Sequence, residues 1–151
     1  MSDFREVIPG TRASHASLAE LQAAMVADEL TSTELTSFYL QRIDRLNPAL
    51  HAVITVNLNA GSEAAASDAA RARSGPRGPL DGIPVLVKDN VQVAGMPTTA
   101  GSPALLSAEP PDAFLIPKLK SSEPTQDLAV YQALVRHLLF SPDEKLMATS
   151  R

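Results

Sequence analysis

The sequence contains no cysteine and no tryptophan, and its aromatic residues are limited to two tyrosines and four phenylalanines among 151 residues. A chain without cysteine has no disulfide, no thiolate nucleophile and no thiolate metal site. Because aromatic rings are so few, any hydrophobic core must be built from leucine, valine, isoleucine and alanine.

Strong charge and long apolar runs are also missing. The chain has 13 basic and 17 acidic residues, a formal net charge of −4, and its basic residues do not cluster with aromatic ones as nucleic-acid binders require. No run approaches the roughly 18 apolar residues of a membrane-spanning helix, and the first ten residues lack the apolar centre of a signal peptide. We therefore expect a cytoplasmic protein with neither nucleic acid nor membrane as a partner.

Metal and nucleotide sites are also not indicated. The histidines His15, His51 and His137 lie far apart without the spacing of metal ligands. Neither a phosphate-binding glycine loop nor the G-x-S-x-G peptide of a common hydrolase class occurs. We expect no metal and no cofactor.

Two capping boxes, each a Ser or Thr followed three residues later by Glu, predict the starts of two helices: Ser17 with Glu20, and Thr31 with Glu34. The second helix is predicted to end at Asn47-Pro48. A third helix is predicted for the alanine-rich segment 59–74, closed by Gly75.

Short β-branched runs follow between the predicted helices. Residues 50–56, LHAVITV, and residues 83–87, IPVLV, are typical of strands. Further on, residues 103–107 predict a short helical turn, and residues 112–120 a helix that Pro117 kinks or delays. The alternation predicts an α/β fold in which helices cover a parallel sheet.

The last 30 residues differ in pattern from the rest of the chain. Apolar residues between Leu128 and Leu139 form one helical face, and Ser141-Pro142 starts a further short helix. We divide the chain into an irregular lead-in (1–16), a main domain (17–120) and a divergent helical tail (121–151). The Leu128–Leu139 face either packs on its own domain or contacts a partner.

Lys88 is the residue with the clearest chemical interest, because α/β folds place ligands at the carboxyl ends of their strands. A lysine is a base only when neutral, a form that burial favours. Taken by itself, the spacing favours a structural role for Lys88 over a base, either as a solvated lysine at a strand end or paired to Asp89. Asp68, near Arg71 and Arg73 on the alanine-rich segment, is expected on a solvated helix face.

Four peptides of this sequence together resemble a known protein family. They are LTSTELTSFYLQRIDRLNP, NLNAGSEAAASD, RGPLDGIPVLVKDN, and MPTTAGSPAL followed by PDAFLIPKL. Over residues 17–119 the chain resembles the N-terminal part of the amidase signature family. The combination of GIPVLVKDN with TTAGS at this spacing is specific.

The resemblance implies a partial amidase-like α/β/α fold and hydrolysis of the C–N bond of a small amide by a Ser-Ser-Lys mechanism. In that family a serine attacks the carbonyl, a second serine in a cis peptide relays a proton, and a lysine, matched here by Lys88, is the base. The family's Gly/Ser-rich segment, which carries both serines, does not occur in residues 121–151. We therefore expect a truncated N-terminal fragment that is inactive alone.

Two alternatives remain open at this point. The chain is either part of an enzyme or a non-catalytic α/β remnant that self-associates or binds a partner through exposed apolar surface. Within the enzyme interpretation, the opening peptide and MPTTAGS resemble stand-alone amidases more than the related amidotransferase component.

Overall fold

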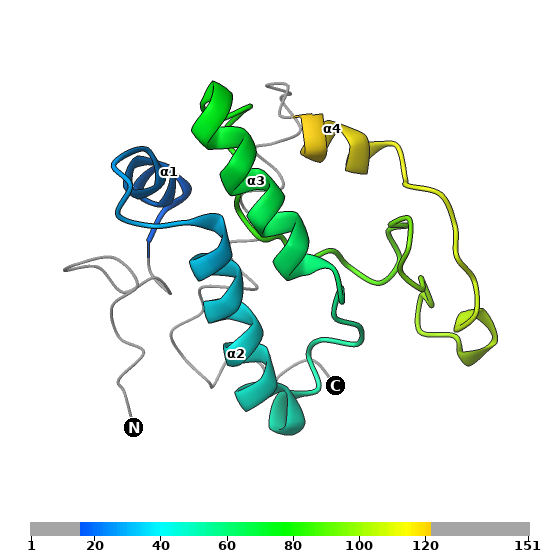
Figure 1. Cartoon of the computed structure of the whole chain (residues 1–151). Coiled ribbons are helices and arrows are strands. Elements are labelled where there is room, and N and C mark those ends of the chain that lie inside the picture. Colours follow the sequence, from blue (N-terminus) through cyan, green and yellow to red (C-terminus); the bar gives the residue numbers. More distant parts are fainter. Residues whose placement is uncertain (1–15, 122–151) are drawn as a thin grey trace.

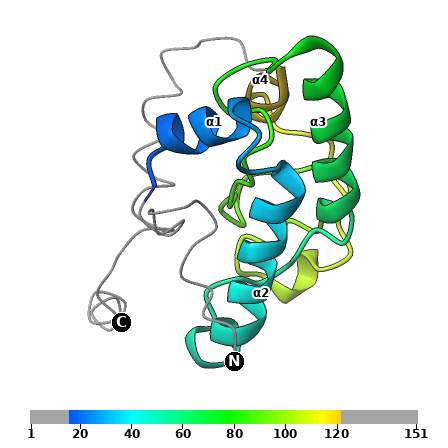
Figure 2. The ribbon, with the colours of Figure 1, turned by 60° about the vertical axis from the view of Figure 1, so that its left-hand side comes forward.

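A computed structural model describes residues 16–121 of the chain. Its elements are three longer helices, a 3-10 turn and a short last helix: α1 (Leu18–Val26), α2 (Ser32–Leu50), α3 (Ala60–Ser74), η2 (Pro103–Leu105) and α4 (Leu115–Ser121). Helices α2 and α3 lie side by side, and α1 lies beside the start of α2 (Figures 1 and 2). The predicted lead-in, except for Ala16, and the two predicted C-terminal helices lie outside the described residues.

The two capping boxes are confirmed. At α1 the Ser17 N–H donates to Oε2 of Glu20 (2.6 Å), and the Glu20 N–H donates to Oγ of Ser17 (3.3 Å). At α2 the Thr31 N–H donates to Oε2 of Glu34 (2.8 Å), and the Glu34 N–H donates to Oγ1 of Thr31 (3.1 Å). Each box satisfies backbone N–H groups that a helix start leaves without an intrahelical partner.

The predicted end of the second helix was three residues early, because α2 contains Pro48 and ends at Leu50. Proline there removes one hydrogen bond near the helix end, where few bonds remain to lose. The turn is closed instead by His51, whose N–H donates to the Asn47 carbonyl (2.8 Å) from a left-handed conformation (φ 49°). The Asn47 side chain also donates to and accepts from the backbone of Val53, both at 2.8 Å.

The predicted α/β class is wrong for the part of the chain that the structure describes. All regular elements among residues 16–121 are helices and none is a β-strand, and the predicted strands 50–56 and 83–87 are irregular apart from the last helical residue, Leu50. The two runs have strand-like composition, but a strand exists only when a neighbour supplies its ladder of hydrogen bonds. Within residues 16–121 no such neighbour lies beside either run.

The remaining predictions hold for the described elements. Helix α3 ends at Gly75, which has φ 74°, and η2 is the predicted turn after Ser102. Helix α4 starts only at Leu115, two residues before Pro117, so the proline lies in the first turn, where its missing N–H costs no helical bond.

The core lies between α1 and the first half of α2. Its buried residues come from both helices and their junction: Ala16, Leu21, Ala24, Met25, Leu30, Leu35 and Tyr39. Phe38 and Ile83 pack against this cluster, so the core holds the beginning of the segment that leads to Lys88. In the described range no helix is long and apolar enough to cross a membrane.

Candidate active site

The segment that carries Lys88 begins at a buried carboxylate, Asp81, which is only 5% exposed. Its carboxylate accepts hydrogen bonds from the Ser67 hydroxyl (2.9 Å), the Arg77 backbone N–H (3.1 Å) and the Arg77 guanidinium. Burial opposes ionisation of Asp81, but these bonds outweigh it and hold the pKa of Asp81 below its ordinary value. Asp81 therefore ties the 77–82 loop to α3 as a charged group.

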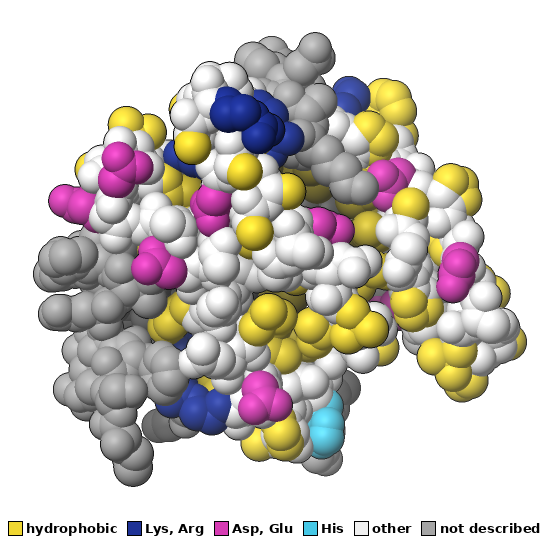
Figure 3. Space-filling model, viewed as in Figure 1, with side chains coloured by type: hydrophobic (Ala, Val, Ile, Leu, Met, Phe, Trp, Pro, Cys, Tyr) yellow, Lys and Arg dark blue, Asp and Glu magenta, His cyan; other side chains and the backbone are white. Residues whose placement is uncertain are grey.

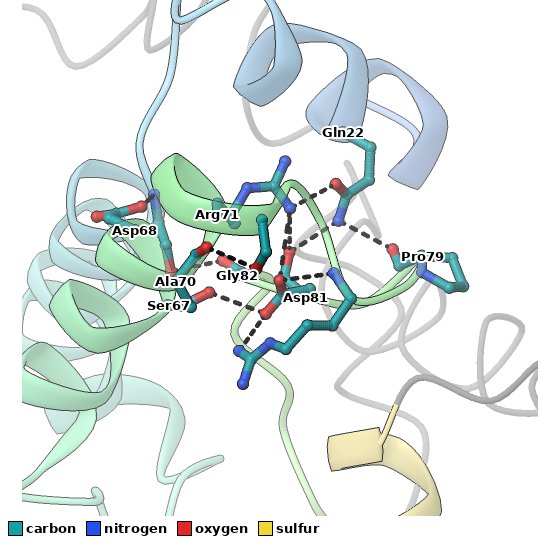
Figure 4. A network of polar contacts seen from close by, with 11 residues as sticks. Gln22, Ser67, Asp68, Ala70, Arg71, Pro79, Asp81 and Gly82 are labelled. Carbon is teal, nitrogen blue, oxygen red and sulfur yellow. Dashed lines mark hydrogen bonds and ion pairs between the residues drawn. The ribbon is translucent and has the colours of Figure 1, made fainter.

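Arg71 and Gln22 complete this network (Figure 4). The Arg71 guanidinium donates to the Gln22 side-chain oxygen (3.0 Å) and to the Asp81 carbonyl (3.1 Å). The Gln22 amide donates to the carbonyls of Pro79 (3.0 Å) and Asp81 (2.8 Å). Side chains of α1 and α3 thus hold the same loop from two sides.

Asp68 does not lie on a solvated helix face, contrary to the sequence prediction. From α3 its carboxylate accepts the backbone N–H groups of Ser32 (2.7 Å) and Thr33 (3.0 Å) and the Thr33 hydroxyl (2.6 Å). These N–H groups belong to the first turn of α2, where a negative charge is favoured by the helix dipole. Asp68 is therefore an N-terminal cap supplied by a neighbouring helix.

Gly82 brings the start of the Lys88 segment into contact with α1 and α2. The Ser32 hydroxyl donates to the Gly82 carbonyl (2.8 Å). A Cβ at this position would lie 3.2 Å from Cβ of Ser32 and 3.3 Å from Sδ of Met25, and φ is 79°. The positive φ favours glycine here, and the close approach leaves little room for a Cβ.

Asp89 holds the other end of the segment, directly after Lys88. Its carboxylate accepts the Thr99 N–H (3.0 Å), the Thr99 hydroxyl and the Gly101 N–H (3.2 Å), and its carbonyl accepts the Ala100 N–H (3.1 Å). The bonds from Thr99 lower the pKa of Asp89 below its ordinary value. The KDN and TTAG peptides are therefore joined by one carboxylate, and this contact explains physically why they occur together.

Lys88 lies between these two anchors, the Ser32–Gly82 contact and the Asp89–Thr99 contact. Its carbonyl accepts the Val91 N–H (2.8 Å) and forms a turn, while its side chain is exposed. Within residues 16–121 no hydrogen bond or ion pair involves the Lys88 ammonium, so the pairing with Asp89 considered from the sequence does not form. The Lys88 backbone is therefore held, while its side chain is exposed to solvent.

Similarity to known proteins covers the same region of the chain. A family model described as "Amidase" matches residues 34–125, more than half of the chain. The chain belongs to the amidase family. The segments around Asp81, Lys88, Asp89 and Thr99 all fall within the matched residues.

Three amidase relatives show how much of a family member is present. The structure of a peptide amidase from Stenotrophomonas maltophilia is 50% identical with a TM-score of 0.68, over 71% of this chain and 23% of that one. An amidase family protein from Bacillus anthracis is 40% identical with a TM-score of 0.66, over 71% and 22%. A glutamyl-tRNA(Gln) amidotransferase component from Aromatoleum aromaticum is 42% identical over 72% and 22%. The chain thus spans less than a quarter of each of these three relatives.

The sequence missed two groups in this amidase segment. Asp81 is bound by Ser67, 14 positions away, and by Arg77, four positions away in a loop, and Asp89 is bound by Thr99, 10 positions away. Outside a regular helix or strand, such spacings give no pairing from sequence alone. A signal was present for Asp89, since KDN and TTAGS are separated by a short loop and both are rich in polar groups.

Proposed function

We propose that residues 16–121 form the lysine-bearing part of an amidase active site that hydrolyses the C–N bond of a small amide, with Lys88 as the base. The observation that carries the proposal is the position of Lys88, fixed by the Ser32–Gly82 contact before it and the Asp89–Thr99 contact after it. A base must be held within hydrogen-bond reach of the hydroxyl that it deprotonates. The two anchors hold the backbone on either side of Lys88, which supports this assignment.

The serine partners of the Ser-Ser-Lys mechanism are not supplied by this chain in our proposal. Lys88 is exposed, whereas a lysine accepts a proton only in the neutral form that a covered site favours. A nucleophile, its base and the groups that stabilise the reacting oxygen act as a unit, so one member alone gives little catalysis. We therefore expect the 151-residue chain by itself not to hydrolyse amides.

Of the two subfamilies, we favour a stand-alone amidase over an amidotransferase component. The support is an identity of 50% to the S. maltophilia peptide amidase compared with 42% to the A. aromaticum amidotransferase component. A small amide, rather than a tRNA-bound one, is the substrate class that we propose.

The role of Lys88 is tested in a chimaera in which residues 17–119 replace the matching 23% of the S. maltophilia peptide amidase. The chimaera is expected to hydrolyse peptide amides, and Lys88→Ala to lower kcat by at least about 10³-fold. Lys88→Arg, which keeps the charge but cannot lose its proton, should be equally inactive.

Lys118→Ala is the matched control, because Lys118 lies over the Phe114 ring (4.4 Å) and belongs to α4. It should leave kcat within about twofold. Full activity in Lys88→Ala would refute the base assignment.

Inactivity of the separate chain is tested with a serine-directed fluorophosphonate and aryl amides. Neither stoichiometric labelling nor turnover is expected. Labelling or turnover that Lys88→Ala abolishes would show that the 151-residue chain is itself an enzyme.

The non-catalytic alternative has one observation in its favour, the large apolar side chains that the described residues leave exposed. Leu58 is 96% exposed, Phe114 80% and Ile54 64%. If the chimaera is inactive while the chain binds a partner, this alternative gains support.

A further inference from the structure

Three consecutive backbone N–H groups, those of residues 99–101, all donate to a single residue, Asp89. The N–H groups of Thr99 (3.0 Å) and Gly101 (3.2 Å) donate to the two carboxylate oxygens. The Ala100 N–H donates to the Asp89 carbonyl (3.1 Å), and the Thr99 hydroxyl adds a further bond to the carboxylate. Successive N–H groups that converge in this way form a nest, a backbone concavity that binds an anion. The Asp89 carboxylate is the anion that fills the nest at residues 99–101.

The backbone of this nest includes a strained residue. Ala100 has φ 48°, in the left-handed region that residues with a Cβ rarely adopt. Such a conformation persists only where surrounding bonds outweigh its cost, and strained residues of this kind cluster at functional sites. The bonds that hold Ala100 are the one from its own N–H to Asp89 and the turn bond from the Ser102 N–H to the Thr99 carbonyl (2.8 Å).

Apolar packing of the loop after the nest does not account for this arrangement. Leu105 and Leu106, in the turn that follows, are 43% and 61% exposed, and Figure 3 shows apolar side chains at the surface of this loop. Thr99, in contrast, is only 5% exposed, and its hydroxyl is bonded to Asp89. A buried hydroxyl needs such a partner. Polar bonds to Asp89 therefore hold the nest beside Lys88.

The same bonds act on the turn that contains Lys88. The Val91 N–H donates to the Lys88 carbonyl (2.8 Å), so residues 88–91 form a turn with Asp89 as its second residue. Because Asp89 follows Lys88 directly, the bonds that fix Asp89 also fix the peptide that joins the two residues. A displacement of about 1 Å at a reacting group can cost about 100-fold in rate. The backbone from which the Lys88 side chain extends is thus held by the nest.

We propose that Asp89 and Thr99 are positioning residues for the reaction at Lys88, because the nest binds the Asp89 carboxylate and so fixes the turn that carries the lysine. The inference rests on the proposed function, in which Lys88 is the base. Both carboxylate oxygens are needed, since one accepts the Thr99 N–H and the other the Gly101 N–H. An amide has only one acceptor oxygen, so Asp89→Asn loses at least one of these two bonds.

The first test measures hydrogen exchange in the 151-residue chain at the Val91 amide, which reports whether the Lys88 turn is closed. Asp89→Asn and Thr99→Val should each speed exchange at Val91 by at least about tenfold, while the amides of α2 stay protected and show that the chain is folded. Thr99→Ser, which keeps the hydroxyl, should exchange as the unchanged chain does. Unchanged exchange at Val91 in either Asp89→Asn or Thr99→Val would overturn the proposal.

The second test measures kinetics in the chimaera with the S. maltophilia peptide amidase. Asp89→Asn and Thr99→Val should each lower kcat by at least about tenfold and change KM by less than about twofold, because positioning acts on the reacting geometry rather than on substrate binding. Thr99→Ser should restore kcat to within about threefold of the unchanged chimaera. If the Asp89 charge acted only on the pKa of Lys88, Asp89→Asn would shift the pH profile of kcat while Thr99→Val stayed fully active. That result would contradict a positioning role.

Asp112→Asn is the matched control in the same region of the chain. The Asp112 carboxylate accepts the Ala94 N–H (2.7 Å), a bond that the single oxygen of an amide still accepts. This variant should leave kcat and the exchange of Val91 within about twofold, and a loss as large as that of Asp89→Asn would overturn the specific role of Asp89.

Lys88→Ala separates this inference from the proposed function. Full activity of Asp89→Asn and Thr99→Val in a chimaera that Lys88→Ala inactivates would refute positioning and leave the base assignment intact. Full activity of Lys88→Ala would instead refute the proposed function, and the inference with it.

Discussion

Residues 16–82 and residues 83–114 of this chain differ in how completely their polar groups are satisfied. The first region contains α1, α2 and α3, two capping boxes, the Asp68 cap and the Asp81 network. The second contains one 3-10 turn, and Leu105, Leu106 and Phe114 are exposed. The helices of the first region are bonded to one another, although residues 54–56 between α2 and α3 have no backbone hydrogen bond within residues 16–121. The second region, with Lys88, contains only the 3-10 turn as a regular element.

The first region is a scaffold, and the second region contains the candidate site. The helical region fixes where the Lys88 segment starts, through Ser32, Gly82 and Ile83. Asp89 and Thr99 fix where it ends. Between these points Val85 to Val87 have no backbone hydrogen bond within residues 16–121, and the Lys88 side chain is exposed.

The largest expected effect is a loss of stability in the helical region when the Asp81 network is broken. Asp81→Asn removes the charge that faces Arg71 and Arg77 and should lower the free energy of unfolding by about 2–3 kcal/mol. This is below the full cost of a broken buried pair, because the Arg77 side chain is 53% exposed. Chemical denaturation measures it. A loss below about 0.5 kcal/mol would show that the network is not stabilising.

The pH dependence of stability that Asp81 causes is a second check on this network. Because the folded-state pKa of Asp81 is lowered, its contribution is complete above the unfolded value and is lost as pH falls through the folded one. Stability of the unchanged chain should therefore decline below about pH 4. The decline should be shallower in Asp81→Asn, and identical curves would contradict the assignment.

A smaller effect compares two glycines of the scaffold. Gly82→Ala should destabilise the chain by about 2 kcal/mol, since the new Cβ meets Ser32 and Met25 at a positive φ. Gly61→Ala, inside α3 with open space around it, should instead stabilise by about 0.5 kcal/mol. Thermal unfolding of both variants measures the difference, and equal shifts would refute the close approach at Gly82.

The smallest effect on global stability is expected in the second region. Asp89→Asn weakens the bonds to Thr99 and Gly101, so their amides should exchange faster while the amides of α2 are unaffected. In the unchanged chain the same loosening should appear on acidification, because Asp89 has a lowered pKa and loses its charge as pH falls through that value. A global loss of protection would show that the two regions unfold together.

Local signals in the sequence predicted the helices well. Ser17 with Glu20, Thr31 with Glu34, and Gly75 act within a few residues, so the sequence contains both partners of each interaction. Family resemblance through GIPVLVKDN and TTAGS was confirmed by the match to residues 34–125. The role of Lys88 stays a prediction.

Distant interactions were not predictable in this way. Strands at 50–56 and 83–87 required neighbours that residues 16–121 do not provide, so strand-like composition did not give strands. Asp68 was placed on a solvated face because its partners, Ser32 and Thr33, are 36 and 35 positions away. Both errors arise from pairing across the fold, which a local pattern does not specify.

Residue-resolved hydrogen exchange on the 151-residue chain distinguishes the helical scaffold from the Lys88 segment. Amides of Leu35 and Tyr39, buried in α2, should exchange at least about a hundredfold more slowly than those of Val85, Leu86 and Val87. Protection at Val85 to Val87 equal to that of α2 would show that the Lys88 segment is already paired and that the two regions do not differ.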